Sequence, residues 1–310
     1  MLLSLIIKPG VEATIGAEHA ALKETLDRTV KFFEAKGIVN PVDTEYLFHH
    51  ALEFLNRVDL YVNFEKIMSK EELDQLRPLI QRRGKGEPVA HITGVRGFYG
   101  RDFKVTPDVL IPRPETELVV DEVLDREKAG QLPEDLSILD LGCGSGCIGL
   151  SLACGLPRAK VVLVEKSESA MAVAKENAQR LGVEQRVEFI LSDVEKLELQ
   201  NKFDIVVANP PYIGVDDEGV MPEVRNSEPH QALFSGDNGF LAPEAWLKKS
   251  REFVGESFLM VFEIGWNQGS RLSDEAKKTF KDAQVRVKKD YNQLDRLLIC
   301  DQTSGTEQHG

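Results

Sequence analysis

The sequence predicts an α/β fold in which helices cover both faces of a mostly parallel sheet, preceded by a small all-helical domain. Up to about Arg83, apolar residues recur at three- and four-residue steps, the pattern of helices with one buried face. After Gly86, short β-branched runs alternate with helical segments, as parallel sheets require. A glycine-rich turn between one such run and a helix agrees with this fold class.

Three helices are expected in the N-terminal block, which begins near Gly16. The first has apolar residues at positions 22, 26, 30 and 33 and would end at Gly37. The second fits residues 43–56. Ser69 and Glu72 have the form of a capping box that opens the third helix. The basic and glycine-rich run 82–86 predicts a boundary, so we expect domains at 1–86 and 87–310.

Five strands and three helices are the clearest elements of the second domain. The predicted strands are 137–141, 161–165, 187–191, 203–208 and 258–262, and the predicted helices are 147–154, 168–181 and 243–253. Two further runs, 283–287 and 296–299, are separated by a stretch too short for a crossover helix. They predict an antiparallel pair at the sheet edge.

Composition limits the classes of function. The 310 residues carry 51 acidic and 38 basic side chains, a net charge of −13, and 42% of them are apolar. This balance disfavours stable nucleic-acid binding. No stretch approaches the ~18 to 20 apolar residues of a membrane span, and the apolar start is too short for a signal peptide. The four cysteines form no C-x-x-C pair, so we expect reduced thiols, no zinc and a cytoplasmic protein.

The glycine-rich turn predicts a cofactor loop. Gly142, Gly144 and Gly146 follow an apolar strand and precede a helix, and they would let a ligand lie against main-chain N–H groups. Counted from Gly142, position 147 holds Cys where a dinucleotide fingerprint would have its third glycine, which disfavours nicotinamide binding. With Asp140 before it, the series resembles the first motif of class I S-adenosylmethionine-dependent methyltransferases.

Two acidic residues end the next strands. Glu165 stands where a carboxylate can accept both hydroxyls of an adenosine ribose, although an ordinary exposed glutamate beside Lys166 fits the sequence equally well. Asp193 and the backbone of Val194 could flank an adenine. The alternative role for Asp193 is to cap the turn that follows.

Asn209-Pro210-Pro211-Tyr212 directly follows the buried strand 203–208. Two prolines end the strand, so the Asn209 amide should project from its carboxyl end. The Asn209 side-chain oxygen and the Pro210 carbonyl would then be two acceptors for one planar –NH2 group, with Tyr212 able to cover its flat face. The tetrapeptide resembles the signature of methyltransferases that act on planar nitrogen, which include adenine-N6 DNA enzymes and glutamine-amide enzymes.

Further stretches resemble one family, the release factor glutamine methyltransferases (PrmC, also called HemK). They are 86–94, 98–100, 103–105, 109–117, 224–230, 233–239 and 263–269. The resemblance covers about Leu73 to Ile299, and residues 1–15 look like an extension outside it. It implies a Rossmann-like seven-stranded sheet with an antiparallel edge hairpin, preceded by a substrate-binding helical domain and a short β junction. It also implies methyl transfer from S-adenosyl-L-methionine to the glutamine amide nitrogen (N5) in the Gly-Gly-Gln loop of a peptide chain release factor.

The resemblance also implies roles for individual residues. The methionine part of the cofactor would lie against Gly142, Cys143, Gly144, Ser145 and Gly146. Glu165 would hold the ribose, and Asp193 and Val194 the adenine. The glutamine amide would be held by Asn209, Pro210, Pro211 and Tyr212, with Asn209 also beside the cofactor. The border of the pocket would include Phe98, Tyr99, Pro112, Arg113 and Glu115.

Some interpretations stay open at this point. The family often has Thr or Ser in place of Cys143 and Asp in place of Glu165, and both changes keep size or charge. Arg113 could instead form an ion pair with Glu115 or Glu117 that fixes the domain junction. The segment 213–238 lacks regular periodicity, which predicts a lid or a substrate-contacting loop.

Three other functions compete with release factor methylation. They are methylation of a ribosomal-protein glutamine, methylation of adenine N6 in DNA, and a non-enzymatic binding module that retains a cofactor fold. The acidic charge disfavours the DNA enzyme, and the intact tetrapeptide disfavours the binding module. We expect a monomer that needs no metal.

Overall fold

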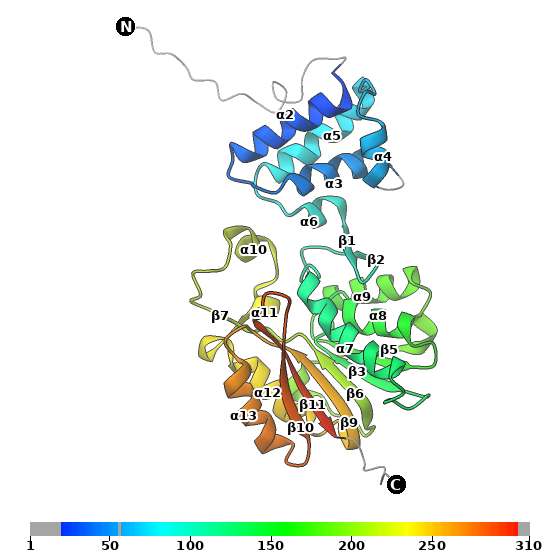
Figure 1. Cartoon of the computed structure of the whole chain (residues 1–310), viewed down its shortest axis with the longest axis vertical. Coiled ribbons are helices and arrows are strands. Elements are labelled where there is room, and N and C mark those ends of the chain that lie inside the picture. Colours follow the sequence, from blue (N-terminus) through cyan, green and yellow to red (C-terminus); the bar gives the residue numbers. More distant parts are fainter. Residues whose placement is uncertain (1–19, 55–56, 303–310) are drawn as a thin grey trace. The chain divides into compact units, whose positions relative to one another are not determined.

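The computed structural model describes residues 20–54 and 57–302, and the chain divides into two compact units. The helical unit comprises residues 1–94 and the sheet unit residues 95–310. Residues 1–15, expected to be an extension, lie outside the described residues. Figure 1 shows helices alone in the first unit and a sheet flanked by helices in the second.

The helical unit contains α2 (Leu22–Glu34), α3 (Pro41–Ala51), α4 (Arg57–Val62), α5 (Lys70–Arg83) and α6 (Val89–Thr93). The capping box at Ser69 and Glu72 is present. The single helix expected at 43–56 is wrong: α3 ends at Ala51, and Glu53 has a φ of 51°, which no right-handed helix accommodates. The core holds buried side chains from α2, α3, α4 and α5, including Phe33, Leu47, Phe48, Leu60, Leu73 and Ile80.

The helical unit extends past the expected boundary at Gly86 and ends at Gly94. The reason is α6, which packs against α3 and α5 and contributes Ile92 to the core. Gly94 terminates α6 with a left-handed backbone, φ 73°.

The sheet unit begins with a hairpin of β1 (Val95–Phe98) and β2 (Arg101–Lys104), the short β junction that was expected. The main sheet has seven strands in the order β10-β11-β9-β6-β3-β4-β5. Their bounds are β3 Ser137–Leu141, β4 Lys160–Glu165, β5 Val187–Leu191, β6 Phe203–Ala208, β9 Val254–Glu263, β10 Gln284–Lys289 and β11 Asp295–Gln302. Strands β5, β4, β3, β6 and β9 are parallel, whereas β11 pairs antiparallel with β9 and with β10.

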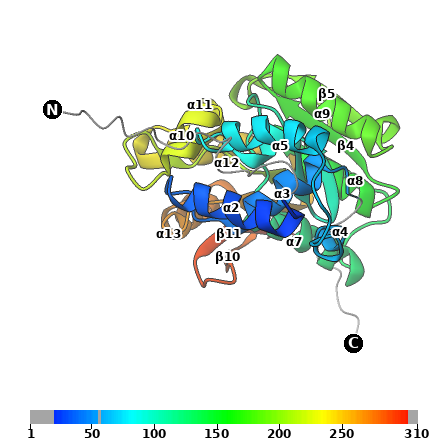
Figure 2. The same ribbon diagram turned by 90° about the horizontal axis from the view of Figure 1, so that it is seen from above.

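Helices cover both faces of this sheet, as predicted. Alternate strand residues supply two separate cores. Residues such as Ile138 and Ile205 pack with α7 (Glu117–Lys128), α8 (Cys147–Gly155) and α9 (Glu168–Arg180). Their neighbours Leu139 and Val206 pack with α12 (Leu241–Ser250) and α13 (Gly269–Thr279). Figure 2 shows α8 and α9 on one side of the sheet unit and α12 and α13 on the other.

All five predicted strands and the antiparallel edge pair are confirmed, with β9 longer than expected. Helices α7 and α13 were not predicted. The segment 213–238 is not irregular: it contains β7 (Ile213–Gly214), α10 (Pro222–Ser227), α11 (His230–Leu233) and β8 (Phe234–Ser235), and Asp237–Gly239 forms a 3-10 turn. A proline starts α10, where its missing N–H costs no helical hydrogen bond, but elements this short leave no periodicity in the sequence.

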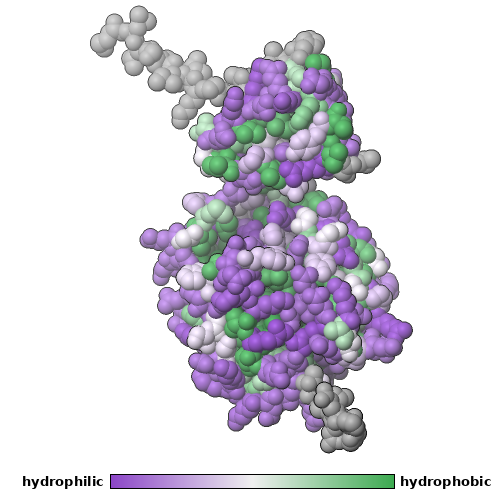
Figure 3. Space-filling view, in the orientation of Figure 1, coloured by the Kyte–Doolittle hydropathy of each residue, from purple (hydrophilic) through white to green (hydrophobic). Residues whose placement is uncertain are grey.

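The visible surface of the sheet unit is mainly hydrophilic with scattered apolar areas (Figure 3). Within the described residues, no helix has both the length and the apolar character needed to cross a membrane.

Candidate active site

A cavity of about 400 Å³ lies in the sheet unit beside the carboxyl ends of its parallel strands. Ligands bind at this edge in open α/β sheets, because the loops that follow the strands converge there. Four such loops contribute, those after β3, β4, β5 and β6. The remaining walls come from segments 108–116 and 229–246.

The glycine-rich loop forms one wall of the cavity, which Gly142, Cys143, Gly144 and Ser145 line and Gly146 does not. Gly142, Gly144 and Gly146 all have positive φ, between 54° and 80°. The loop is held by main-chain hydrogen bonds, Cys143 N–H to the Val164 carbonyl (2.9 Å) and Gly146 N–H to the Cys143 carbonyl (2.8 Å). A Cβ at Gly144 would meet no heavy atom within 4 Å, so open space lies beside it.

Glu165 is buried at the end of β4 and faces the cavity. Its Oε2 accepts from the Gly144 N–H (3.0 Å) and its Oε1 from the Ser167 N–H (2.9 Å). The exposed glutamate that the sequence left open is therefore not found. Each carboxylate oxygen has a second lone pair, so both can still accept a ligand hydroxyl.

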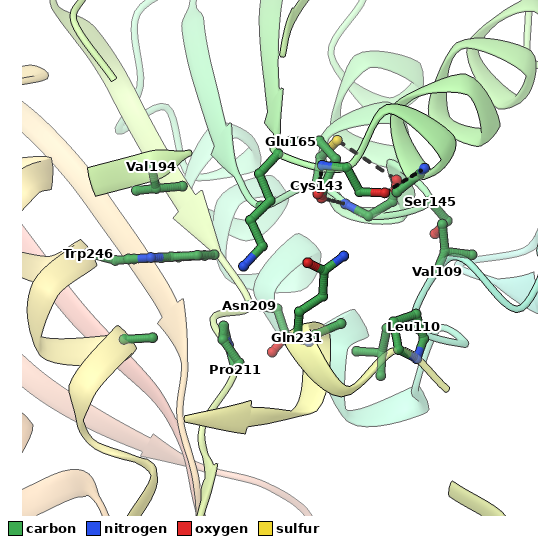
Figure 4. Close-up of a pocket in the computed structure, with 18 of the residues that line it drawn as sticks. Val109, Leu110, Cys143, Ser145, Glu165, Val194, Asn209, Pro211, Gln231 and Trp246 are labelled. Carbon is green, nitrogen blue, oxygen red and sulfur yellow. Dashed lines mark hydrogen bonds between the residues drawn. The ribbon is translucent and has the colours of Figure 1, made fainter. Parts of the chain in front are cut away.

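Asp193 and Val194 line one end of the cavity together with Trp246 of α12. Asp193 also caps the turn that follows, because its Oδ1 accepts from the Glu195 N–H (3.0 Å). Figure 4 shows Val194 and Trp246 at the opposite end of the cavity from Val109 and Leu110. This end therefore offers a flat apolar surface next to a carboxylate.

The tetrapeptide after β6 reaches the cavity with two of its four residues. Asn209 and Pro211 line it, whereas Pro210 and Tyr212 do not. The Tyr212 hydroxyl donates to Glu263 Oε1 (2.9 Å). The structure therefore does not bring Tyr212 to the place expected of a ring that covers a substrate amide.

Thr116, which lines the cavity, and Glu263 connect the two ends of the tetrapeptide. The Asn209 Nδ2 donates to Thr116 Oγ1 (3.3 Å), and Thr116 Oγ1 donates to Glu263 Oε2 (2.6 Å). Burial raises the pKa of Glu263, while hydrogen bonds from Thr116 and Tyr212 oppose that rise. The charge of Glu263 and burial raise the pKa of Tyr212 well above its usual range, so its hydroxyl stays a donor.

The residues expected at the pocket border divide into two groups. Pro112 and Arg113 line the cavity, and Phe98, Tyr99 and Glu115 do not. Phe98 instead packs edge-on against Phe103 in the core, with ring centroids 6.0 Å apart. The Tyr99 hydroxyl donates to Asp121 (2.9 Å) in α7, and burial and this bond raise its pKa to about 12.

Arg113 forms an ion pair with Glu228, not with Glu115 or Glu117. The Glu228 side chain is 1% exposed, and its Oε2 also accepts from the Ile111 N–H (2.9 Å). Glu117 has a different role, since its Oε1 accepts from the Tyr99 N–H (2.7 Å).

Sequence reasoning gave no role to five residues that the site brings in: Thr116, Glu228, Gln231, Trp246 and Glu263. Gln231 points from α11 into the cavity (Figure 4). Four of the five lie within or next to stretches that resembled the family, which was the available signal. Trp246 lies on a helix outside those stretches, and nothing in the sequence marked it.

Among the described residues, no group of three or more His, Cys, Asp or Glu side chains could hold a metal ion. Burial raises the pKa of the Cys143 thiol well above its usual value and that of Cys147 to about 12, so both remain protonated near neutral pH. Neither thiol is a nucleophile in this state.

Comparison with known proteins identifies both parts of the chain. The family models that match are "Methyltransferase domain", over residues 132–285, and "PrmC N-terminal domain", over residues 24–94. The release factor glutamine methyltransferase of Geobacter sulfurreducens is 39% identical over 280 residues, 89% of this chain and 95% of the relative. The enzyme of the same name from Staphylococcus aureus is 33% identical, over 89% of this chain and 97% of the relative. The chain therefore belongs to the release factor glutamine methyltransferase family.

Proposed function

We propose that this chain transfers a methyl group from S-adenosyl-L-methionine to the side-chain amide nitrogen (N5) of the glutamine in the Gly-Gly-Gln loop of a peptide chain release factor. The observation that carries the proposal is that the glycine-rich loop and Asn209 line one cavity. A cofactor loop and a group able to hold a planar amide are thereby adjacent. The names of the relatives support the same substrate.

The cavity suits the cofactor in size and chemistry. Its volume falls within the range of roughly 300 to 1,000 Å³ typical of ligand pockets. The open space beside Gly144 leaves room for the methionine part, with Cys143 and Ser145 in the same loop. Glu165 would accept the ribose hydroxyls, and Val194 with Trp246 would contact the adenine, near Asp193. When bound, S-adenosylmethionine supplies an electrophilic methyl group on a positively charged sulfur.

The protein must make a weak nucleophile reactive. An amide nitrogen is a poor nucleophile because its lone pair is delocalised into the carbonyl. In our proposal the Asn209 side-chain oxygen, which lies at the cavity, and the carbonyl of Pro210, which itself does not line the cavity, accept the two hydrogens of the substrate –NH2 group. These hydrogen bonds favour a pyramidal nitrogen and aim its lone pair into the cavity.

The wider proposal concerns partners and location. We infer that the helical unit contributes to binding the release factor, and that the enzyme acts as a cytoplasmic monomer without stable nucleic-acid binding. The net charge of −13 supports the last point, because a phosphate backbone repels an acidic surface. Size-exclusion chromatography tests whether the chain is a monomer. A DNA-binding titration at low salt tests whether it lacks stable nucleic-acid binding.

The deciding experiment incubates the purified chain with labelled S-adenosylmethionine and a release factor. Parallel reactions contain the release factor with its Gly-Gly-Gln glutamine changed to alanine, duplex DNA, or ribosomal proteins. We expect one added methyl group on the glutamine peptide of the intact factor alone. Label on DNA or on a ribosomal protein instead would contradict the proposed substrate and support one of the alternatives.

A further inference from the structure

A chain of hydrogen bonds, buried at its centre and half-buried at both ends, runs from Asn209 through Thr116 and Glu263 to Tyr212. Its members come from three places in the sheet unit: the turn after β6, the 3-10 turn Pro114–Thr116, and the end of β9. Thr116 and Glu263 are each 1% exposed. Water therefore does not compete for the bond between Thr116 and Glu263, and its direction is set by the side chains alone.

The direction of each bond follows from the acceptor at the centre. The Thr116 and Tyr212 hydroxyls each donate to one oxygen of Glu263, so the single hydrogen of the Thr116 hydroxyl is already in use. What Thr116 then offers to Asn209 is a lone pair. Only the nitrogen of the Asn209 amide can donate to a lone pair, so the oxygen turns away from Thr116. In the part of the chain that the structure describes, Asn209 Oδ1 has no hydrogen-bond partner.

We propose that Thr116 and Glu263 are positioning residues that fix the Asn209 amide with its oxygen presented to the substrate. This inference rests on the proposed function, in which that oxygen accepts from the glutamine amide. If the Asn209 amide were flipped, two N–H groups would meet and the substrate would lose one of its two acceptors. Tyr212 acts at the other carboxylate oxygen, where its hydroxyl donates to Glu263 Oε1.

A purely structural network would behave differently. Thr116 and Glu263 join segments 147 residues apart, so removing their bond should lower stability in either case. A positioning role adds a loss of turnover that appears only when Asn209 is present. Stability and turnover therefore have to be measured separately.

The test compares Thr116→Val, Thr116→Ser and Glu263→Gln in the full chain. Valine keeps the shape and removes the hydroxyl, serine restores the hydroxyl, and glutamine replaces an obligate acceptor by a group that also donates. Thr279→Val is the matched control, because that hydroxyl donates to the Glu275 carbonyl within α13, away from the cavity. The readouts are kcat and KM with the release factor, cofactor Kd by calorimetry, and thermal unfolding.

We expect Thr116→Val and Glu263→Gln to lower kcat at least ~10-fold while cofactor Kd changes less than ~3-fold, since misplacing a positioning group affects mainly the reacting atoms. Thr116→Ser should recover most of the kcat, and the control should match the parent. In an Asn209→Ala background, Thr116→Val should cause no further loss of kcat, because its effect acts through Asn209.

Two results would overturn the inference: a kcat for Thr116→Val within ~2-fold of the parent, or an equal further loss in the Asn209→Ala background. If Thr116→Val does not fold, the Glu263→Gln and Asn209→Ala pair supplies the same cycle. Failure of the proposed function is a separate outcome, since the unmodified chain would then not methylate the release factor at all.

Discussion

Arg113 and Glu228, which are 115 residues apart in the sequence, form an ion pair at one wall of the cavity. Glu228 also accepts from the Ile111 N–H. One buried carboxylate, directly before segment 229–236, thus holds that segment to segment 108–113, and both segments line the cavity. The shape of that wall depends on this junction.

Arg113→Ala should therefore weaken both the fold and the cofactor site. It leaves the buried Glu228 carboxylate with only the Ile111 N–H, and we expect the free energy of unfolding to fall by about 1 to 3 kcal/mol. Cofactor affinity should fall as well, because the wall loosens. Chemical denaturation and calorimetry measure the two effects. The control is Arg158→Ala, whose ion pair with Glu134 is exposed and should contribute nothing measurable. Equal behaviour of the two variants would contradict the assigned junction.

Asn209→Ala should reduce turnover by ~10²-fold or more and change cofactor affinity only a few-fold, since its oxygen acts at the reacting nitrogen. Single-turnover kinetics with the release factor and calorimetry with the cofactor measure the two quantities. Parallel losses in both would show that Asn209 serves the cofactor rather than the substrate.

Substitutions at Gly142 and Gly144 should have different effects although both have positive φ. A Cβ at Gly142 would lie 2.4 Å from the Trp246 ring, so Gly142→Ala should destabilise the sheet unit and change tryptophan fluorescence. A Cβ at Gly144 would point into open space, so Gly144→Ala should cost only the backbone strain of about 1 to 2 kcal/mol.

Gly144→Val should in addition abolish cofactor binding, because its branched side chain would occupy the space beside the methionine part. Calorimetry with S-adenosylmethionine measures this, and thermal unfolding shows that the variant is folded. Tight binding by a folded Gly144→Val would contradict our placement of the cofactor.

Asp140 predicts a pH dependence of stability. Burial raises its pKa from 3.8 to about 7, so the folded state keeps a proton that the unfolded state releases. This contribution to stability is complete below pH 3.8 and is lost as pH rises towards 7, an effect of up to about 4 kcal/mol. In Asp140→Asn the amide oxygen can still accept from the Gly149 N–H, which now donates to Asp140 Oδ2 (2.9 Å), and the side chain does not titrate.

The difference in unfolding free energy between Asp140→Asn and the parent should therefore grow in favour of the variant from pH 5 to pH 7 and level off above about pH 7. The unpartnered amide N–H adds an offset that does not change with pH. Both tryptophans, at positions 246 and 266, lie in the sheet unit, so denaturation followed by their fluorescence reports that unit. A flat difference across this range would refute the prediction.

The elements that were predictable each leave a pattern over consecutive residues, whereas α7, α13 and the short elements of segment 213–238 were not predicted. Apolar runs identified the central strands, glycines the loop after β3, and paired prolines the end of β6. The contacts between distant segments were not predictable in this way. Thr116 and Glu263, or Arg113 and Glu228, meet only because the sheet order brings their segments together. Trp246 reaches the cavity for the same reason, as one residue on an otherwise ordinary helix.

The place of β11 between β9 and β10 has a consequence for synthesis on the ribosome. A nascent chain that has emerged only as far as β10 has no strand along the outer edge of β9, where backbone groups then lie open to water or to other chains. Glu263 ends β9 and faces Leu297 of β11 in the register. The Glu263 carboxylate, which accepts from Thr116 and Tyr212, therefore gains its neighbouring strand β11 only after residues 295–302 have been made. The site is thus completed late in translation.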